Sequence, residues 1–164
     1  MTLRAGSSVV AFAFVVAAVV LLLGDAVIRG SWAVGARGAG PGALVVWGAW
    51  MLLVRPSIRV LPDRAVITNV GRITEVPWAR VVDIRRKLQL VFELDDDRRL
   101  EAWGSPFASR RRTDDDPSLI ALRGAWMSAQ DASSGAVVRR PDSVALLIGA
   151  AAVLFLVITL VVFR

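Results

Sequence analysis

The chain has 164 residues, of which 55% are hydrophobic and 21% are charged, and its formal net charge is +6. These fractions fit together only if apolar and charged residues occupy separate segments, as in a membrane protein that carries a water-facing domain. Cysteine and histidine are absent, which excludes disulfides, thiolate metal sites and every catalytic or zinc site that depends on histidine.

Three apolar stretches are candidate membrane spans, since about 20 apolar residues cross a hydrocarbon core of roughly 30 Å. The first covers residues 9–28, and the last covers residues 143–164, with no charge between Val144 and Phe163. The middle stretch, residues 38–54, is glycine-rich and contains Pro41, but it ends in the strongly apolar ALVVWGAWMLLV. We expect three spans, the first two forming a transmembrane hairpin within residues 1–54. The alternative is two spans with residues 38–54 as a re-entrant or surface segment.

The arginines that flank the spans predict an orientation, because cytoplasmic loops carry an excess of Lys and Arg. If the N-terminus is cytoplasmic, that side holds Arg4, Arg55, Arg59, Arg64, Arg139 and Arg140, and the other side holds Arg29, Arg37 and Arg164. We therefore expect a multi-pass protein of the cell (inner) membrane, with the segment between the second and third spans in the cytoplasm.

Residues 55–131 alternate between apolar and polar positions, which is typical of half-buried strands. Strands are expected at SIRVL, AVITNV, RITEV, VVDI, LQLVFEL and RLEAW. Gly71 suits the positive φ of a hairpin turn, and Asp95–Asp97 suit the turn of a second hairpin. Six short strands with frequent turns predict an antiparallel sandwich or a partly open barrel.

One helix is expected to close this domain, with Asp116 as the N-cap and Pro117 at its first position. Its apolar face consists of Leu119, Leu122, Trp126 and Ala129, with Ile120 and Met127 flanking that face. Trp126 would plug one end of the sandwich, and Arg123 falls inside the face, where it needs a partner. Residues 132–142 are expected to be a Ser/Gly linker to the last span.

The order of these elements resembles a pleckstrin-homology (PH) fold. Residues 55–103 are similar to the bacterial PH-like domain of the low-molecular-weight protein antigen 6 family, small actinobacterial membrane proteins with two spans before the domain. The resemblance rests on Arg55-Pro56, Asn69, Gly71, the structural motif Val76-Pro77-Trp78-Ala79 and Val82-Asp83-Ile84. It implies α-helical spans plus a small α+β PH-like domain over residues 55–131, and it brings no catalytic residues.

Two acidic runs, Asp95–Asp97 and Asp114–Asp116, are the candidates for metal or acid–base chemistry. The first lacks the alternating ligand spacing of a calcium loop, and the second is explained as a favourable charge at a helix N-terminus. We interpret them as a solvated turn and a helix cap. No catalytic residue, metal site or cofactor is predicted, and the protein is not expected to be an enzyme.

Two basic clusters are candidates for contact with lipid or a partner: Arg85, Arg86 and Lys87, and Arg110, Arg111 and Arg112. The alternative for the second cluster is local pairing with Asp114–Asp116. In PH folds that capture phosphoinositides, basic residues surround the first hairpin loop, where this chain offers only Arg64. Nucleic-acid binding is not expected, because the clusters are short and lack interleaved aromatic residues.

The expected function is a non-catalytic protein-interaction or scaffolding module held at the membrane, with other membrane proteins or membrane-associated proteins as partners. The alternative is a sensor of anionic lipid headgroups at the membrane surface. A third hypothesis, an accessory part of a transporter, draws on Asp25 and Arg37 near the ends of spans. Trp78, Trp103 and Trp126 are expected in the core of the domain.

Overall fold

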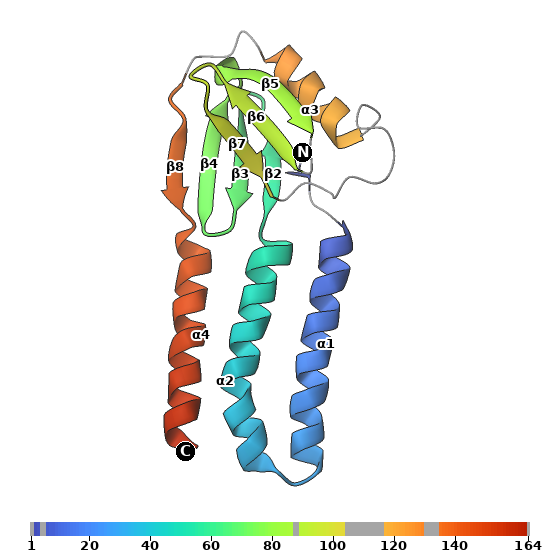
Figure 1. Cartoon of the computed structure of the whole chain (residues 1–164), viewed down its shortest axis with the longest axis vertical. Coiled ribbons are helices and arrows are strands. Elements are labelled where there is room, and N and C mark those ends of the chain that lie inside the picture. Colours follow the sequence, from blue (N-terminus) through green and yellow to red (C-terminus); the bar gives the residue numbers. More distant parts are fainter. Residues whose placement is uncertain (1, 4–5, 87–88, 104–116, 130–134, 164) are drawn as a thin grey trace. The chain divides into compact units, whose positions relative to one another are not determined.

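The computed structural model describes residues 2–3, 6–86, 89–103, 117–129 and 135–163. The chain divides into two compact units. The first, here called the β-unit, contains Met1–Gly6 and Arg55–Asp142, and the second, the helical unit, contains Ser7–Val54 and Ser143–Arg164. Figure 1 shows the elements of both units in sequence colours.

The helical unit is built from α1 (Gly6–Ile28), α2 (Trp32–Ala49) and α4 (Ser143–Val162). A π-helical turn, Trp50–Val54, continues α2. In the described residues, three helices are long and apolar enough to cross a membrane: Ser7–Ile28, Trp32–Val54 and Ser143–Val162. The three apolar stretches expected from the sequence are therefore helical.

The second of these helices begins at Trp32, six residues before the expected start of the span at residue 38. The charge of Arg37 suggested a boundary, but its guanidinium donates a hydrogen bond to the carbonyl of Phe163 at the end of α4. Terminal carbonyls of a helix lack partners within the helix, so this bond satisfies both groups. The continuous helix of 23 residues is about 35 Å long at 1.5 Å per residue, a full-span length.

Small residues allow α2 and α4 to pack closely. A Cβ at Gly40 of α2 would lie 2.1 Å from the Thr159 hydroxyl oxygen and 2.7 Å from Leu156 Cα, both in α4. A Cβ at Gly149 of α4 would lie 2.3 Å from the Trp47 ring, whose Nε1 donates to the Ala145 carbonyl at 3.0 Å. Gly40 of α2 and Gly149 of α4 are thus two positions where the absence of a side chain lets these helices approach each other.

The β-unit contains two antiparallel sheets and one helix. The first sheet has the order β1-β2-β3-β4-β8, formed by Thr2–Leu3, Ser57–Val60, Arg64–Asn69, Arg72–Pro77 and Val138–Pro141. The second has the order β5-β6-β7, formed by Val81–Arg86, Leu90–Leu94 and Arg99–Ala102. The helix, α3, spans Pro117–Ser128. The six strands expected between residues 57 and 102 are all present.

The turns follow from residues that tolerate unusual backbone angles. Gly71 has φ +70° between β3 and β4, as expected, and Asp97 has φ 59° between β6 and β7. Asp is one of the few non-glycine residues that enter the left-handed region readily. Pro77 ends β4, and Trp78–Arg80 then form a short 3-10 turn that leads into β5.

The core lies between the two sheets and under α3. Its largest fully buried side chains include Trp78, Phe92, Ile58, Ile67 and Ile84 from the strands and their turn, joined by Leu119 and Leu122 from α3. The Trp78 indole nitrogen donates to the Leu61 carbonyl at 2.9 Å, so the buried polar atom of this side chain is satisfied. Trp126 packs against the core as expected, whereas Trp103 is 53% exposed, so the core expectation for Trp103 was wrong.

The predicted face of α3 is confirmed: Leu119, Leu122 and Ala129 are buried. Arg123 has the partner that it needed, because its Nη2 donates to the Ile84 carbonyl at 3.0 Å. Ile120 and Met127, expected to flank the core face, are 59% and 65% exposed. The expected N-cap, Asp116, lies outside the described residues.

The expected linker, residues 132–142, contains a strand that the sequence did not predict. Val138–Pro141 form β8, which pairs antiparallel with β4, and all four residues are exposed. An edge strand exposed on both faces has no apolar alternation to reveal it, since only burial of one face produces that pattern. The N-terminal Thr2–Leu3 likewise add β1 beside β2.

Candidate functional site

The first predicted basic cluster is partly engaged in ion pairs. Arg85 Nε lies 2.7 Å from an Asp83 carboxylate oxygen, and its Nη2 lies 3.5 Å from Glu93. The hydrogen bond that Arg85 donates to Asp83 is the main cause that raises the pKa of Arg85. Arg86 is the last residue of β5. Lys87 and the second cluster, Arg110–Arg112, lie outside the described residues, so their contact with lipid or a partner stays a prediction.

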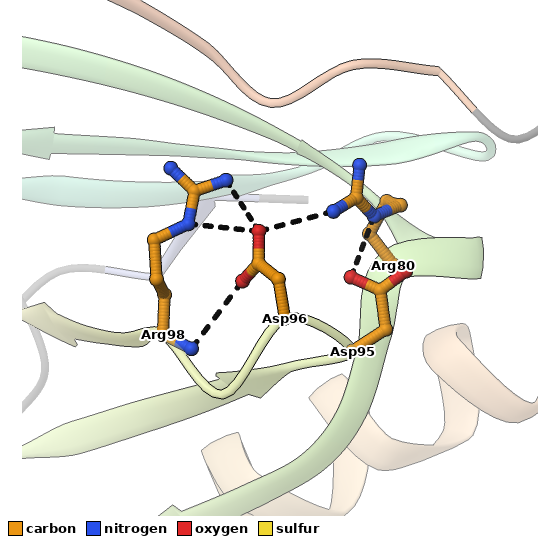
Figure 2. Close-up of polar contacts among 4 residues, drawn as sticks. All are labelled: Arg80, Asp95, Asp96 and Arg98. Carbon is orange, nitrogen blue, oxygen red and sulfur yellow. Dashed lines mark hydrogen bonds and ion pairs between the residues drawn. The ribbon is translucent and has the colours of Figure 1, made fainter.

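The acidic turn after β6 is neutralised by arginines (Figure 2). Arg80 Nε donates to Asp95 at 2.6 Å, and its Nη2 donates to Asp96 at 3.1 Å. Arg98 donates to the same Asp96 carboxylate through Nε at 2.8 Å, through Nη2, and through its backbone N–H at 3.3 Å. The turn therefore uses its carboxylates to close the β6–β7 hairpin and to attach it to Arg80.

This arrangement makes a prediction for Asp96. Its hydrogen bond from Arg98 is the main cause that lowers its pKa to about 2. A carboxyl with a lowered pKa in the folded state stabilises that state above its ordinary pKa, and this contribution is lost as pH falls toward 2. We expect Arg98→Ala to move the Asp96 pKa back toward 3.8, as followed by carboxyl carbon NMR during an acid titration. Arg99→Ala, whose side chain pairs with Glu93 instead, is the control and should leave Asp96 unchanged.

The turn between β2 and β3 also contains an arginine that forms ion pairs with carboxylates. Arg64 Nη2 lies 2.7 Å from Asp63, and its Nη1 lies 3.0 Å from Glu75 of β4. These contacts raise the pKa of Arg64, with the Asp63 hydrogen bond as the main cause, and they lower the pKa of Asp63. Arg64 is the one arginine that the sequence offers at the first hairpin loop, and its guanidinium is already shared by two carboxylates.

An ion pair joins the two ends of the main segment of the β-unit. Arg55 Nε lies 2.5 Å from Asp142 Oδ2, and its Nη2 lies 2.7 Å from Oδ1, so the contact is bidentate. The Asp142 side chain is 1% exposed and that of Arg55 is 29% exposed. The hydrogen bond that Arg55 donates to Asp142 is the main cause that raises the pKa of Arg55. Arg55 directly follows the second apolar helix and Asp142 directly precedes the last, so this pair fixes both chain ends together.

Side chains form hydrogen bonds with backbone groups of the outer strands of the second sheet, β5 and β7. At β5, the Trp126 indole nitrogen donates to the Val81 carbonyl at 3.0 Å, and Arg123 donates to the Ile84 carbonyl. At β7, the Asn69 amide nitrogen donates to the Glu101 carbonyl at 2.7 Å, and the Trp103 N–H donates to the Asn69 side-chain oxygen at 3.0 Å. Both outer strands of this sheet therefore have backbone groups that are already bonded.

In the first sheet, β1 covers β2, and the other outer strand is β8, which Figure 1 shows beside β4. The ladder alternates between bonded and non-bonded pairs. The Asp142 N–H donates to the Gly71 carbonyl at 3.0 Å, which places the pairs Arg72–Pro141 and Thr74–Arg139 at non-bonded positions. Pro141, which has no N–H, fits such a position. The N–H and C=O of Arg139 therefore point away from β4, toward the edge of the sheet.

Next to this edge lies a basic hollow of about 350 Å³, lined by Gly71, Arg72, Arg139, Arg140 and Pro141. Arg140 contacts Glu75 at 3.3 Å, and Glu75 also holds Arg64. Arg72 and Arg139 have no ion pair with any residue that the structure describes. Sequence reasoning missed this pair of arginines, because they come together only through the pairing of β8 with β4. Arg139 was counted only as a flanking charge.

These features define a small two-sheet β-unit in which an ion pair joins the two ends of the main segment. The same chain contains three helices long and apolar enough to cross a membrane. Comparison with protein-family models, with curated proteins and with solved structures finds no match.

Proposed function

We propose that this protein is a non-catalytic interaction module held at a membrane surface, which binds an extended segment of a membrane protein or membrane-associated protein by strand addition at β8. The observation that carries the proposal is the outward N–H and C=O of Arg139 on a fully exposed strand. Exposed strand edges accept an additional strand through main-chain hydrogen bonds.

The connectivity of the β-unit supports insertion of all three helices. β1 pairs with β2, so residues 2–3 and 57–60 belong to one sheet and must lie on one side of a bilayer. The chain between them must then cross an even number of times, so α1 and α2 either both cross or neither crosses. The length of Trp32–Val54 favours two crossings, and it argues against the re-entrant alternative. The last helix, α4, would make the third crossing.

A PH-like identity for the β-unit is part of this proposal. It is supported by the chain order of six antiparallel strands followed by α3, and by Leu119 and Leu122, which belong to the same buried cluster as residues of both sheets. The strand β8 is an addition to the expected pattern. A cytoplasmic β-unit in a bacterial inner membrane is supported by the arginines at Arg55, Arg139 and Arg140, close to the helix ends.

The main segment of the β-unit continues directly into an apolar helix at each of its two ends, and this attachment would favour binding to other membrane-bound segments. Residues Arg55 and Asp142 each adjoin such a helix, so a membrane-inserted chain confines the β-unit to a thin layer beside the bilayer. Confinement raises the effective concentration of the β-unit toward other membrane-bound segments without any new contact. Weak strand addition would then suffice for a stable association.

A substitution pair tests strand addition. Arg139→Pro removes the outward N–H but leaves the bonded positions of the β4–β8 ladder intact, since residue 139 lies at a non-bonded position. Arg139→Gln keeps the N–H and removes the charge. In proximity labelling by the full chain in its native cells, we expect reproducible membrane-protein neighbours for wild type and Arg139→Gln. For Arg139→Pro we expect these neighbours to be lost.

Two results would contradict the proposal. If Arg139→Pro labels the same neighbours as wild type, strand addition at β8 is wrong. If wild type labels no more than an unrelated membrane protein does, the interaction module itself is wrong. As a control, limited proteolysis is compared between wild type and Arg139→Pro, and an unchanged pattern would show that the variant keeps its fold.

A second function, binding of anionic lipid headgroups, is favoured by one specific observation. Arg72 and Arg139 share a hollow, and neither has an acidic partner in the described part of the chain. The candidate site for this second function therefore differs from the basic clusters expected from the sequence.

A further inference from the structure

We propose that the hollow formed by Gly71, Arg72, Arg139, Arg140 and Pro141 binds the phosphate of an anionic membrane lipid. This inference rests on the membrane insertion proposed above, and it does not depend on strand addition. It assigns a ligand to Arg72 and Arg139, which have no ion pair with any described residue of the β-unit.

The register brings the two guanidinium groups to one face of the first sheet. Arg72 is paired with Pro141 and Thr74 with Arg139, so Arg72 and Arg139 are diagonal neighbours on adjacent strands. Diagonal positions are about 7–8 Å apart at the backbone, within reach of two long side chains that converge on one ligand. Two like charges in this position repel each other unless an anion lies between them. Arginine suits such an anion, because its planar donor fork matches the oxygens of a phosphate.

Two acidic groups on the same strands as the hollow, or next to them in the chain, are already occupied. Glu75 accepts from Arg64 at 3.0 Å and from Arg140 at 3.3 Å. Asp142 is 1% exposed and is held by Arg55 through both carboxylate oxygens. Neither carboxylate is left to neutralise Arg72 or Arg139, so among the described residues the lining of the hollow is positively charged. A hollow of about 350 Å³ is ample for a phosphate and its attached headgroup.

Covalent connectivity favours a lipid as the source of the phosphate. Arg139 precedes Ser143, the first residue of α4, by four residues, so it lies within about 14 Å of that helix along an extended chain. The Gly71 carbonyl is bonded to the N–H of Asp142, the last residue before α4. The hairpin tip that carries Arg72 is therefore fixed beside the point where the chain enters an apolar helix. In an inserted chain, this point is where lipid phosphates are concentrated.

The test uses the full chain in neutral detergent micelles, with bound lipids counted by native mass spectrometry. The ligands are phosphatidylglycerol, phosphatidylcholine with the same acyl chains, and inorganic phosphate. We expect saturable binding of phosphatidylglycerol in preference to the other two, weakened about fivefold by Arg72→Gln and about fivefold by Arg139→Gln. Arg59→Gln is the matched control, because Arg59 on β2 also has no ion pair with a described residue and lies outside the hollow.

Each other outcome overturns the inference. Equal weakening by Arg59→Gln would show diffuse attraction to net charge, and equal binding of phosphatidylcholine would remove the role of the anion. Equal binding of inorganic phosphate would identify a free phosphate as the ligand. An acidic peptide that binds and is lost in the arginine variants, with lipid binding unchanged, would identify a protein ligand.

A separate measurement distinguishes failure of this site from failure of the proposed function. Carbonate extraction of membranes tests whether the chain is integral, independently of Arg72 and Arg139. If the chain is extracted, the membrane part of the proposed function is wrong. If the chain stays in the membrane and both arginine variants bind lipid like wild type, the site alone is wrong.

Discussion

Arg55→Ala is expected to destabilise the β-unit by about 3 kcal/mol, the lower end of the range for breaking a buried ion pair. Asp142 is 1% exposed and loses a bidentate partner whose contacts are 2.5 and 2.7 Å. Asp142→Asn should cost less, about 1–2 kcal/mol, because Arg55 is 29% exposed and its charge can be solvated. The structure therefore predicts an asymmetry between the two partners.

This asymmetry is measured by pulse proteolysis of the full chain in detergent across a urea series. The readout is cleavage within the β-unit, which reports its free energy of unfolding separately from that of the helices. Arg98→Ala, in an exposed ion pair with Asp96, is the control and should lower the midpoint much less than Arg55→Ala does, because exposed ion pairs contribute little to stability. If Arg55→Ala behaves like Arg98→Ala, the ion pair does not hold the ends of the β-unit together.

Trp78→Ala should have the largest effect in the β-unit, a loss of about 3–5 kcal/mol. Trp78 is fully buried between the sheets, and its removal leaves a cavity and an unsatisfied Leu61 carbonyl. Trp78→Phe keeps most of the volume but loses the indole donor, and it should cost about 1–3 kcal/mol.

Trp103→Ala is the matched control for this prediction, because Trp103 is the same residue type and is 53% exposed. It should change the free energy of unfolding by no more than about 0.5 kcal/mol. Both variants are measured by the same urea series. A similar loss in Trp103→Ala and Trp78→Ala would contradict the placement of the core.

Local chemistry explains why many elements could be predicted from the sequence. The positive φ of Gly71, the turn at Asp95–Asp97 and the end of β4 at Pro77 each depend on the backbone preference of one or a few adjacent residues. The apolar face of α3 follows from a spacing of 3.6 residues per turn. These features are properties of short segments, so a sequence without a structure is sufficient to locate them.

The errors fall where long-range contacts override local pattern. Trp103 is a large aromatic residue of the kind often found in a core. It follows β7 at the edge of the sheet, where its backbone N–H donates to Asn69, and its ring is exposed. Arg37 looked like the end of a span, but a carbonyl from the end of α4 accepts its hydrogen bond. In both cases the deciding partner is distant in the sequence, and nothing in the local segment specifies it.

By itself, the sequence determined that apolar helices flank a charged domain of antiparallel strands, because hydrophobic periodicity is a property of neighbouring residues. Only the tertiary structure decided which groups remain available for binding. It pairs Arg64, Arg80, Arg85 and Arg98 with carboxylates, and it bonds outer backbone groups of β5 and β7 to side chains. It also folds Val138–Pro141 back onto β4, which places Arg139 beside Arg72. Availability depends on the partners that each group meets in space, and strand pairing across more than sixty residues sets those partners.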